Sequence, residues 1–145
     1  MIAFIKNIIS RKKYPQIFAL RKQKNYLDAT SWHDDDLSNV PIDTICLTLE
    51  NAIITDKGIM SLPQLTMLKC IDLDSTKITD KSIDKLISFK RLEELWIEDT
   101  KITDDGFKKL TSLKNLRFIS FLDTDISDDA YNYIKQHLPD TKLHG

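Results

Sequence analysis

Apolar residues recur at a fixed interval along most of the chain. Residues 68–91, LKCIDLDSTKITDKSIDKLISFKR, are followed in the same frame by residues 92–115 (LEELWIEDTKITDDGFKKLTSLKN) and 116–139 (LRFISFLDTDISDDAYNYIKQHLP). Residues 44–67, TICLTLENAIITDKGIMSLPQLTM, precede them and fit the same frame. A fixed period in the twenties is typical of a solenoid, in which each repeat contacts only its neighbours. The period therefore takes precedence over any shorter pattern.

Within each repeat, two apolar columns lie two residues apart, which is the spacing of side chains on one face of a strand. A second pair of columns lies three residues apart, which is a helix spacing. A hydroxyl and a carboxylate stand between them, as at Thr79-Asp80, and such a pair favours the start of a helix. The strand columns are Leu47/Ile71/Leu95/Ile119 and Leu49/Leu73/Ile97/Phe121, and the helix columns are Ile59/Ile83/Phe107/Tyr131 and Leu62/Leu86/Leu110/Ile134.

Each repeat is therefore predicted to be a short strand, a turn and a short helix, with all strands parallel. The strands should centre on residues 47–49, 71–73, 95–97 and 119–121, with a weaker one near 25–27. The helices should follow at about 57–64, 81–88, 105–112 and 129–137.

The pattern L-x-x-L-x-L-x-x-T-x-I-T-D-x-G-x-x-x-L resembles the leucine-rich repeat, in the Thr-Asp-Gly form common in bacterial proteins and F-box-type adaptors. The resemblance covers about two thirds of the chain. It implies an α/β fold, a right-handed solenoid with a parallel sheet on the concave face and short helices on the convex face, and a binding scaffold without enzymatic activity. One departure is that the asparagine usual after the strand is replaced by Ala52, Thr76, Thr100 or Thr124.

The rest of the chain extends this arrangement at both ends. Residues 27–40, LDATSWHDDDLSNV, align with residues 73–86, so residues 25–43 are predicted to form a degenerate first repeat. Four 24-residue repeats follow at 44–139, and residues 140–145 are expected to add a strand stub, because Leu143 lies one period after Ile119. The run His33-Asp34-Asp35-Asp36 is better explained by a helix N-terminus than by a metal site.

The N-terminal segment differs from the repeats in charge. Residues 1–27 hold seven Lys and Arg and no acid, whereas the remainder holds 14 basic and 22 acidic residues, and the whole chain carries −1. Ile2, Ile5 and Ile9 share one helical face, so residues 1–24 are predicted to be a helical cap over the first repeat. Docking of a partner, contact with a membrane surface and mitochondrial targeting are the alternatives. A secretory signal is disfavoured, since Lys6 interrupts the apolar run, and no stretch has transmembrane length.

Common catalytic motifs are absent from the sequence. It has no Gly-rich phosphate loop, no H-E-x-x-H and no Cys/His metal spacing, so we expect no enzymatic activity, no cofactor and no metal. Cys46 and Cys70 lie one period apart and should be neighbours on adjacent strands. Without a secretory signal, free thiols and a cytoplasmic location are the prediction.

The predicted binding site lies on the strand positions that alternate with the buried leucines. From Cys46 to Leu122 these outward positions carry five acids and no base, and Trp96 and Phe118 are expected among them as exposed large aromatics. Aromatic anchors surrounded by charge of one sign are typical of a recognition surface. The predicted protein-binding residues are Asp72, Asp74, Glu94, Trp96, Glu98 and Phe118.

An acidic surface repels nucleic acid and attracts a basic protein. The sequence favours a monomeric inhibitor or immunity-type protein that binds a basic partner such as a nuclease toxin. The alternative is an adaptor or assembly factor, resembling F-box or ATP-synthase factor B-like repeat proteins, whose N-terminal segment docks one partner and whose solenoid docks another.

Overall fold

The computed structural model describes residues 24–145, so the predicted N-terminal cap lies outside the described residues except for Lys24. The chain forms one six-stranded sheet in which spatial order follows sequence order and every neighbouring pair is parallel. The strands are β1 (Tyr26–Asp28), β2 (Cys46–Thr48), β3 (Cys70–Asp72), β4 (Glu94–Trp96), β5 (Phe118–Ser120) and β6 (Lys142–His144). The parallel pairing is as predicted, and strands β2 to β5 lie one residue earlier than the predicted centres.

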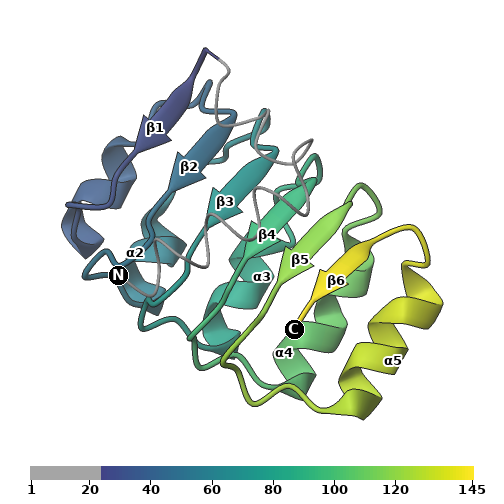
Figure 1. Cartoon of the computed structure of the whole chain (residues 1–145). Helices are drawn as coiled ribbons and strands as arrows, with labels where there is room; N and C mark the ends of the chain where they lie inside the picture. Colours follow the sequence, from purple (N-terminus) through teal and green to yellow (C-terminus); the bar gives the residue numbers. More distant parts are fainter. Residues whose placement is uncertain (1–23) are drawn as a thin grey trace.

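A short helical segment follows each of the first five strands, and these segments cover one face of the sheet (Figure 1). They are η2 (Asp34–Asn39), α2 (Asp56–Ser61), η3 (Asp80–Ser82) with α3 (Ile83–Leu86), α4 (Asp104–Lys109) with η4 (Leu110–Ser112), and α5 (Asp128–His137). Three of these segments are wholly or partly 3-10 helix, because so short a repeat leaves little length for an α-helix once the strand and two connections are made. Within residues 24–145, no helix combines the length and apolarity that a membrane crossing requires.

The core lies between the sheet and the helices and follows the predicted columns. The strand residues Leu47, Ile71, Leu95 and Ile119 are all fully buried, and so are the helix residues Ile59, Ile83 and Phe107. Tyr131, the last member of that helix column, is only partly buried at the C-terminal end. A large apolar side chain removed from water contributes about 1.5–3 kcal/mol, so stacking of the repeats supplies the stability that one repeat lacks.

A ladder of carboxylates joins each repeat to the next. Asp56 Oδ1 accepts a hydrogen bond from the backbone N–H of Thr79 at 2.8 Å, and Asp56 Oδ2 accepts one from the Thr79 hydroxyl at 2.7 Å. Each of the other ladder carboxylates also accepts both donors of the hydroxyl residue that precedes the next helix. These pairs are Asp34 with Thr55, Asp80 with Thr103, and Asp104 with Ser127. The aspartate at each helix start therefore fastens the start of the following helix.

The ladder explains the glycine of the Thr-Asp-x-Gly pattern. A Cβ at Gly58 would lie 2.4 Å from Asp34 Oδ1, and a Cβ at Gly106 would lie 2.2 Å from Asp80 Oδ1. At the equivalent position one repeat later than Gly58, Ser82 donates its hydroxyl to Asp56 Oδ1 at 2.6 Å. The column therefore accepts glycine, or a side chain that adapts to the carboxylate.

The strand exits are held by a second periodic device. Asn51, Ser75, Asp99 and Asp123 adopt positive φ angles between 50° and 59°, and polar residues such as Asn and Asp tolerate this region best. One residue later, the hydroxyls of Thr76, Thr100 and Thr124 donate to the carbonyl oxygens of Leu73, Ile97 and Phe121. Threonine thus satisfies a turn carbonyl where the leucine-rich repeat pattern has asparagine.

Candidate protein-binding face

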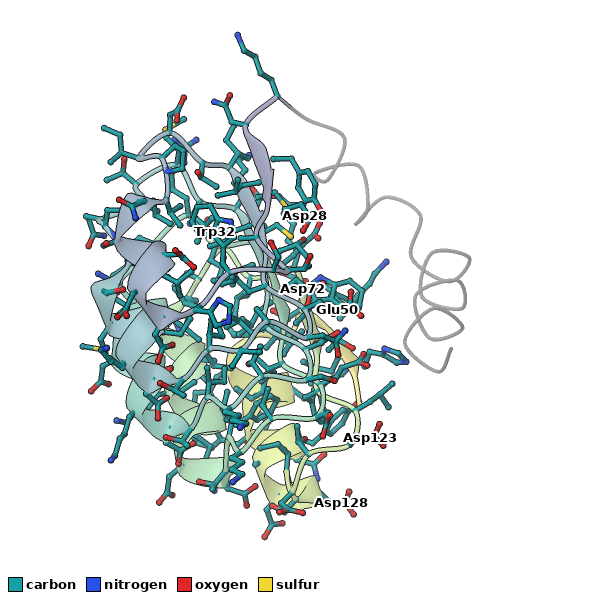
Figure 2. The ribbon with its side chains drawn as sticks, turned by 90° about the vertical axis from the view of Figure 1, so that its left-hand side faces the viewer. Asp28, Trp32, Glu50, Asp72, Asp123 and Asp128 are labelled. Carbon is teal, nitrogen blue, oxygen red and sulfur yellow. The ribbon has the colours of Figure 1, made fainter. Side chains whose placement is uncertain are left out.

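We call the side of the sheet that faces away from the helices the outer face. The strand pairing places Asp72 beside Trp96, Trp96 beside Ser120, and Glu94 beside Phe118. Asp74 and Glu98 follow the third and fourth strands and lie close together, since the Glu98 N–H donates to Asp74 Oδ1 at 2.8 Å. Figure 2 shows Asp28, Glu50, Asp72 and Asp123 on the strand side of the molecule, opposite the helices. The fold therefore brings the predicted site residues together on three adjacent strands.

These side chains are far less exposed than the sequence suggested. Asp72 is 2 % exposed, Glu94 3 %, Trp96 4 % and Glu98 5 %, while Phe118 is completely buried. The expectation that Trp96 and Phe118 are exposed aromatics is therefore wrong. Their positions in the strands are as predicted, but alternation in a strand specifies only the direction of a side chain and not its contact with water.

The aromatic part of the outer face is a packed group. The ring centroids of Trp96 and Phe118 lie 4.8 Å apart with an interplanar angle of 49°, which is a favourable tilted arrangement. The Phe118 ring also lies 6.4 Å from the His144 ring on β6. These two ring contacts run across three adjacent strands, β4 to β6, and form an aromatic centre of the outer face.

The acidic part of the outer face is crowded with like charges. Asp74 is half-buried, and its own N–H donates to Asp72 Oδ1 at 3.1 Å. Burial, together with the neighbouring charges of Asp72, Glu98 and Glu50, raises the pKa of Asp74 to about 10. Hydrogen bonding from Glu98 N–H acts in the opposite direction and is outweighed. Burial is the largest cause of this shift, and the three neighbouring carboxyl groups add to it.

Two residues of the last strand belong to the same face. Lys142 pairs in register with Phe118, and His144 pairs with Ser120, so both lie one period after outward positions of β5. The predicted site did not include them, although the period of the repeat places them there. They add a basic residue and an imidazole at the C-terminal end of an otherwise acidic face.

Ser120, His144 and Glu98 meet on this face, but not in the order of a nucleophilic relay. The Ser120 hydroxyl hydrogen-bonds to Glu98 Oε1 and lies 3.1 Å from His144 Nδ1. His144 Nδ1 is 3.9 Å from Glu98 Oε1, so the same ring nitrogen faces both partners. A catalytic relay places the imidazole between the hydroxyl and the carboxylate and uses its two nitrogens separately. The arrangement therefore does not match a serine nucleophile.

The two cysteines and the acidic run at residues 34–36 do not form a ligand site, because each has a place in the packing or hydrogen bonding of the fold. Cys46 and Cys70 are paired in register and fully buried, and they are not joined to each other by a disulfide. In the acidic run at residues 34–36, Asp34 belongs to the carboxylate ladder and Asp35 pairs with Lys57 at 2.9 Å. Asp36 accepts the N–H of His33 at 2.8 Å. Across residues 24–145, no group of three or more His, Cys, Asp or Glu is placed to hold a metal ion.

The chain was compared with protein-family models, curated proteins and solved structures. No protein-family model matches the chain, and no curated protein matches it. Among solved structures, the chain is similar to an internalin (inlF) from Listeria monocytogenes strain 4b F2365, with 14% sequence identity and a TM-score of 0.49. The similarity covers 71% of this chain and 35% of the internalin chain.

Proposed function

We propose that the chain is a leucine-rich-repeat solenoid whose outer face is concave and binds a basic protein. The observation that carries the proposal is the crowding of acids and aromatics on and directly after three adjacent strands, where strand pairing places Asp72 beside Trp96 and Glu94 beside Phe118. Such a surface speeds the approach of a cationic partner, and its aromatic centre supplies apolar contact once the partner has docked. The proposed contact residues are Asp72, Asp74, Glu94, Trp96, Glu98 and Phe118.

Among basic partners, we favour one that this protein inhibits. An acidic surface matched to a cationic active site blocks that site without any chemistry of its own, as an immunity-type protein blocks a nuclease toxin. This role needs no cofactor, no metal and no catalytic group, and it suits a cytoplasmic monomer. It also agrees with the order of Ser120, His144 and Glu98, which does not match a nucleophilic relay.

The alternative is an adaptor or assembly factor, and the charge asymmetry of the sequence is the observation that favours it. A basic N-terminal segment and an acidic repeat region offer two chemically different docking surfaces in one chain. In this case two partners would bind at once, and only one of them would depend on the outer face.

The test is capture of partners by the full chain, followed by matched charge-neutral variants. Glu94→Gln with Glu98→Gln removes two charges from the outer face and keeps the side-chain shape. Asp105→Asn with Asp129→Asn removes the same charge from exposed helix positions and serves as the control. We expect the outer-face pair to slow association with the basic partner at least tenfold at low salt, with a smaller effect at high salt, and the control pair to leave it unchanged.

Truncation of Trp96 provides a second test, because tryptophan is enriched at binding hot spots. Trp96→Ala should weaken binding by about 2 kcal/mol or more. Its melting curve must be recorded in parallel, since the side chain is buried. Full affinity in a folded Trp96→Ala protein, with loss of binding in the helix-side variants, would place the site on the helices and end the proposal.

A further inference from the structure

Within the described part of the chain, the side chains on the outer face of the sheet are buried although no helical segment lies on that face. The helical segments of residues 24–145 all lie on the opposite side of the sheet (Figure 1). Nevertheless Asp72, Glu94 and Glu98 are at most 5 % exposed, and Trp96 is 4 % exposed. A solvated sheet face normally leaves carboxylates largely in water, because charged side chains are rarely buried unless they are paired. Side chains buried to this degree indicate that the outer face is covered by another part of the protein or by a partner.

The chain carries a segment whose chemistry complements this face. Residues 1–23 contain six Lys and Arg and no acid. Their first nine residues place Ile2, Ile5 and Ile9 at helical spacing, with Phe4 and Ile8 beside them. A basic segment with an apolar stripe offers positive charge for the outer-face carboxylates and an apolar surface for the Trp96 and Phe118 rings.

The segment is also long enough to reach the whole face. It enters the described structure at Lys24, directly before β1, which is the edge strand of the sheet. Trp96 lies three strands away, about 14 Å at a strand spacing of about 4.8 Å, and Phe118 lies about 5 Å further. A segment of this length spans about 35 Å even if it is fully helical, so chain connectivity does not limit the docking.

We propose that residues 1–23 are an internal ligand of the outer face, with their basic side chains on its carboxylates and their apolar side chains over Trp96 and Phe118. The role that follows is regulatory and rests on the proposed function. A basic partner that uses this face must displace the segment, so its apparent affinity is lowered by the fraction of molecules in which the face is covered. Only a partner whose affinity for the outer face exceeds that of the segment would then bind appreciably.

Zero-length carbodiimide cross-linking of the dilute full chain locates the segment directly. We expect Lys12 and Lys13 to be joined to Glu94, Glu98 or Asp72 within one molecule, as identified by mass spectrometry. Cross-links confined to Asp35, Asp36 and Asp43, within the first repeat, would support a cap on that repeat and overturn the proposal. Cross-links between isotope-labelled and unlabelled copies would assign the face to a second molecule and overturn it equally.

Charge reversal in the full chain tests the same contact by thiol accessibility, because Cys46 and Cys70 lie on the outer face. Arg11→Glu, Lys12→Glu and Lys13→Glu together should speed the reaction of these thiols with a thiol reagent at least tenfold. The control reverses three exposed loop lysines, Lys77→Glu, Lys101→Glu and Lys114→Glu, and should change the rate less than twofold. Equal rates in the two variants would overturn the proposal.

A charge swap keeps the test valid if the reversed chain is destabilised. Glu94→Lys and Glu98→Lys, added to the Arg11→Glu, Lys12→Glu and Lys13→Glu chain, should restore the slow thiol reaction, and failure to restore it would contradict an ionic contact. None of these measurements uses a partner protein. If cross-links fall elsewhere while Glu94→Gln with Glu98→Gln still weakens partner binding, the internal ligand fails and the proposed function stands. If the cross-links are as expected and Glu94→Gln with Glu98→Gln leaves partner binding unchanged, the proposed function fails instead.

Discussion

Two sets of aspartates in this chain meet opposite environments. The ladder aspartates lie at the helix starts and accept hydrogen bonds from the next repeat, whereas Asp74 lies on the outer face among other carboxylates. Although partial burial acts to raise it, hydrogen bonds from Ser82 and Thr79 hold the pKa of Asp56 below its ordinary value. Burial, together with neighbouring like charges, moves the pKa of Asp74 in the other direction, to about 10.

The difference shows that the same residue type holds the fold together in one place and works against it in another. Ladder carboxylates satisfy backbone and hydroxyl donors at every repeat boundary, so they add to stability. On the outer face, the raised pKa of Asp74 means that ionising this carboxyl reduces stability, which a protein tolerates where the charge serves binding. The following predictions test this division, from the largest expected effect to the smallest.

Trp96→Ala should give the largest loss of stability. The side chain is 4 % exposed and packs against Phe118, so truncation removes a large buried ring and leaves a cavity. We expect the free energy of unfolding to fall by about 3 kcal/mol, measured by urea denaturation. Tyr133→Ala, at an exposed aromatic position on α5, is the control and should cost much less. A loss equal to that of the control would mean that the outer face is solvated.

Asp56→Ala should destabilise the chain by about 2 kcal/mol, because Thr79 N–H, Thr79 Oγ1 and Ser82 Oγ lose their acceptor. Asp105→Ala, an exposed aspartate of α4, is the control.

The wild-type chain should also lose stability as the pH falls below about 4. The folded-state pKa of Asp56 lies below its unfolded value, so the stabilisation is present above the unfolded pKa and disappears as the folded carboxylate is protonated. Asp56→Ala should show a weaker acid dependence.

Asp74→Asn should stabilise the chain at neutral and alkaline pH, opposite to the ladder substitution. The folded-state pKa is raised from 3.8 to about 10, so folding favours the protonated form and stability declines as the pH rises between these values. An amide cannot ionise, and the gain should be about 1 kcal/mol or more at pH 8 and should vanish near pH 4. Thermal melts of both proteins from pH 4 to pH 9 measure this difference. Parallel curves would show that Asp74 ionises normally.

Asp35→Asn should have the smallest effect, although its carboxylate makes a well-formed ion pair with Lys57 at 2.9 Å. Both side chains are strongly exposed, and such pairs contribute little because water and salt screen them. The melting temperature should be unchanged within the error of the measurement. A clear decrease would mean that ion pairs between repeats add to the ladder.

Much of the molecule could be predicted from the sequence because the repeat supplies the same evidence four times. The parallel strands, the order of the helices and the buried columns follow from the spacing of apolar residues within a repeat and from the constant length of the repeats. Each repeat confirms these spacings independently. The last strand, β6, was expected from Leu143 alone, since a period predicts position even in a short stub. The neighbouring positions of Cys46 and Cys70 followed in the same way.

The sequence by itself thus determined which residues face the helices and which face outward, because a strand alternates its side chains whatever surrounds it. Only the tertiary structure decided how much water those outward residues meet, and it showed Trp96 and Phe118 to be buried. It also decided in which direction the pKa of each aspartate is shifted. Asp56 and Asp74 both accept hydrogen bonds from the following repeat, but these bonds dominate at Asp56, whereas burial and like charges outweigh them at Asp74. Periodicity is local and readable along the chain, whereas burial and charge depend on contacts between repeats.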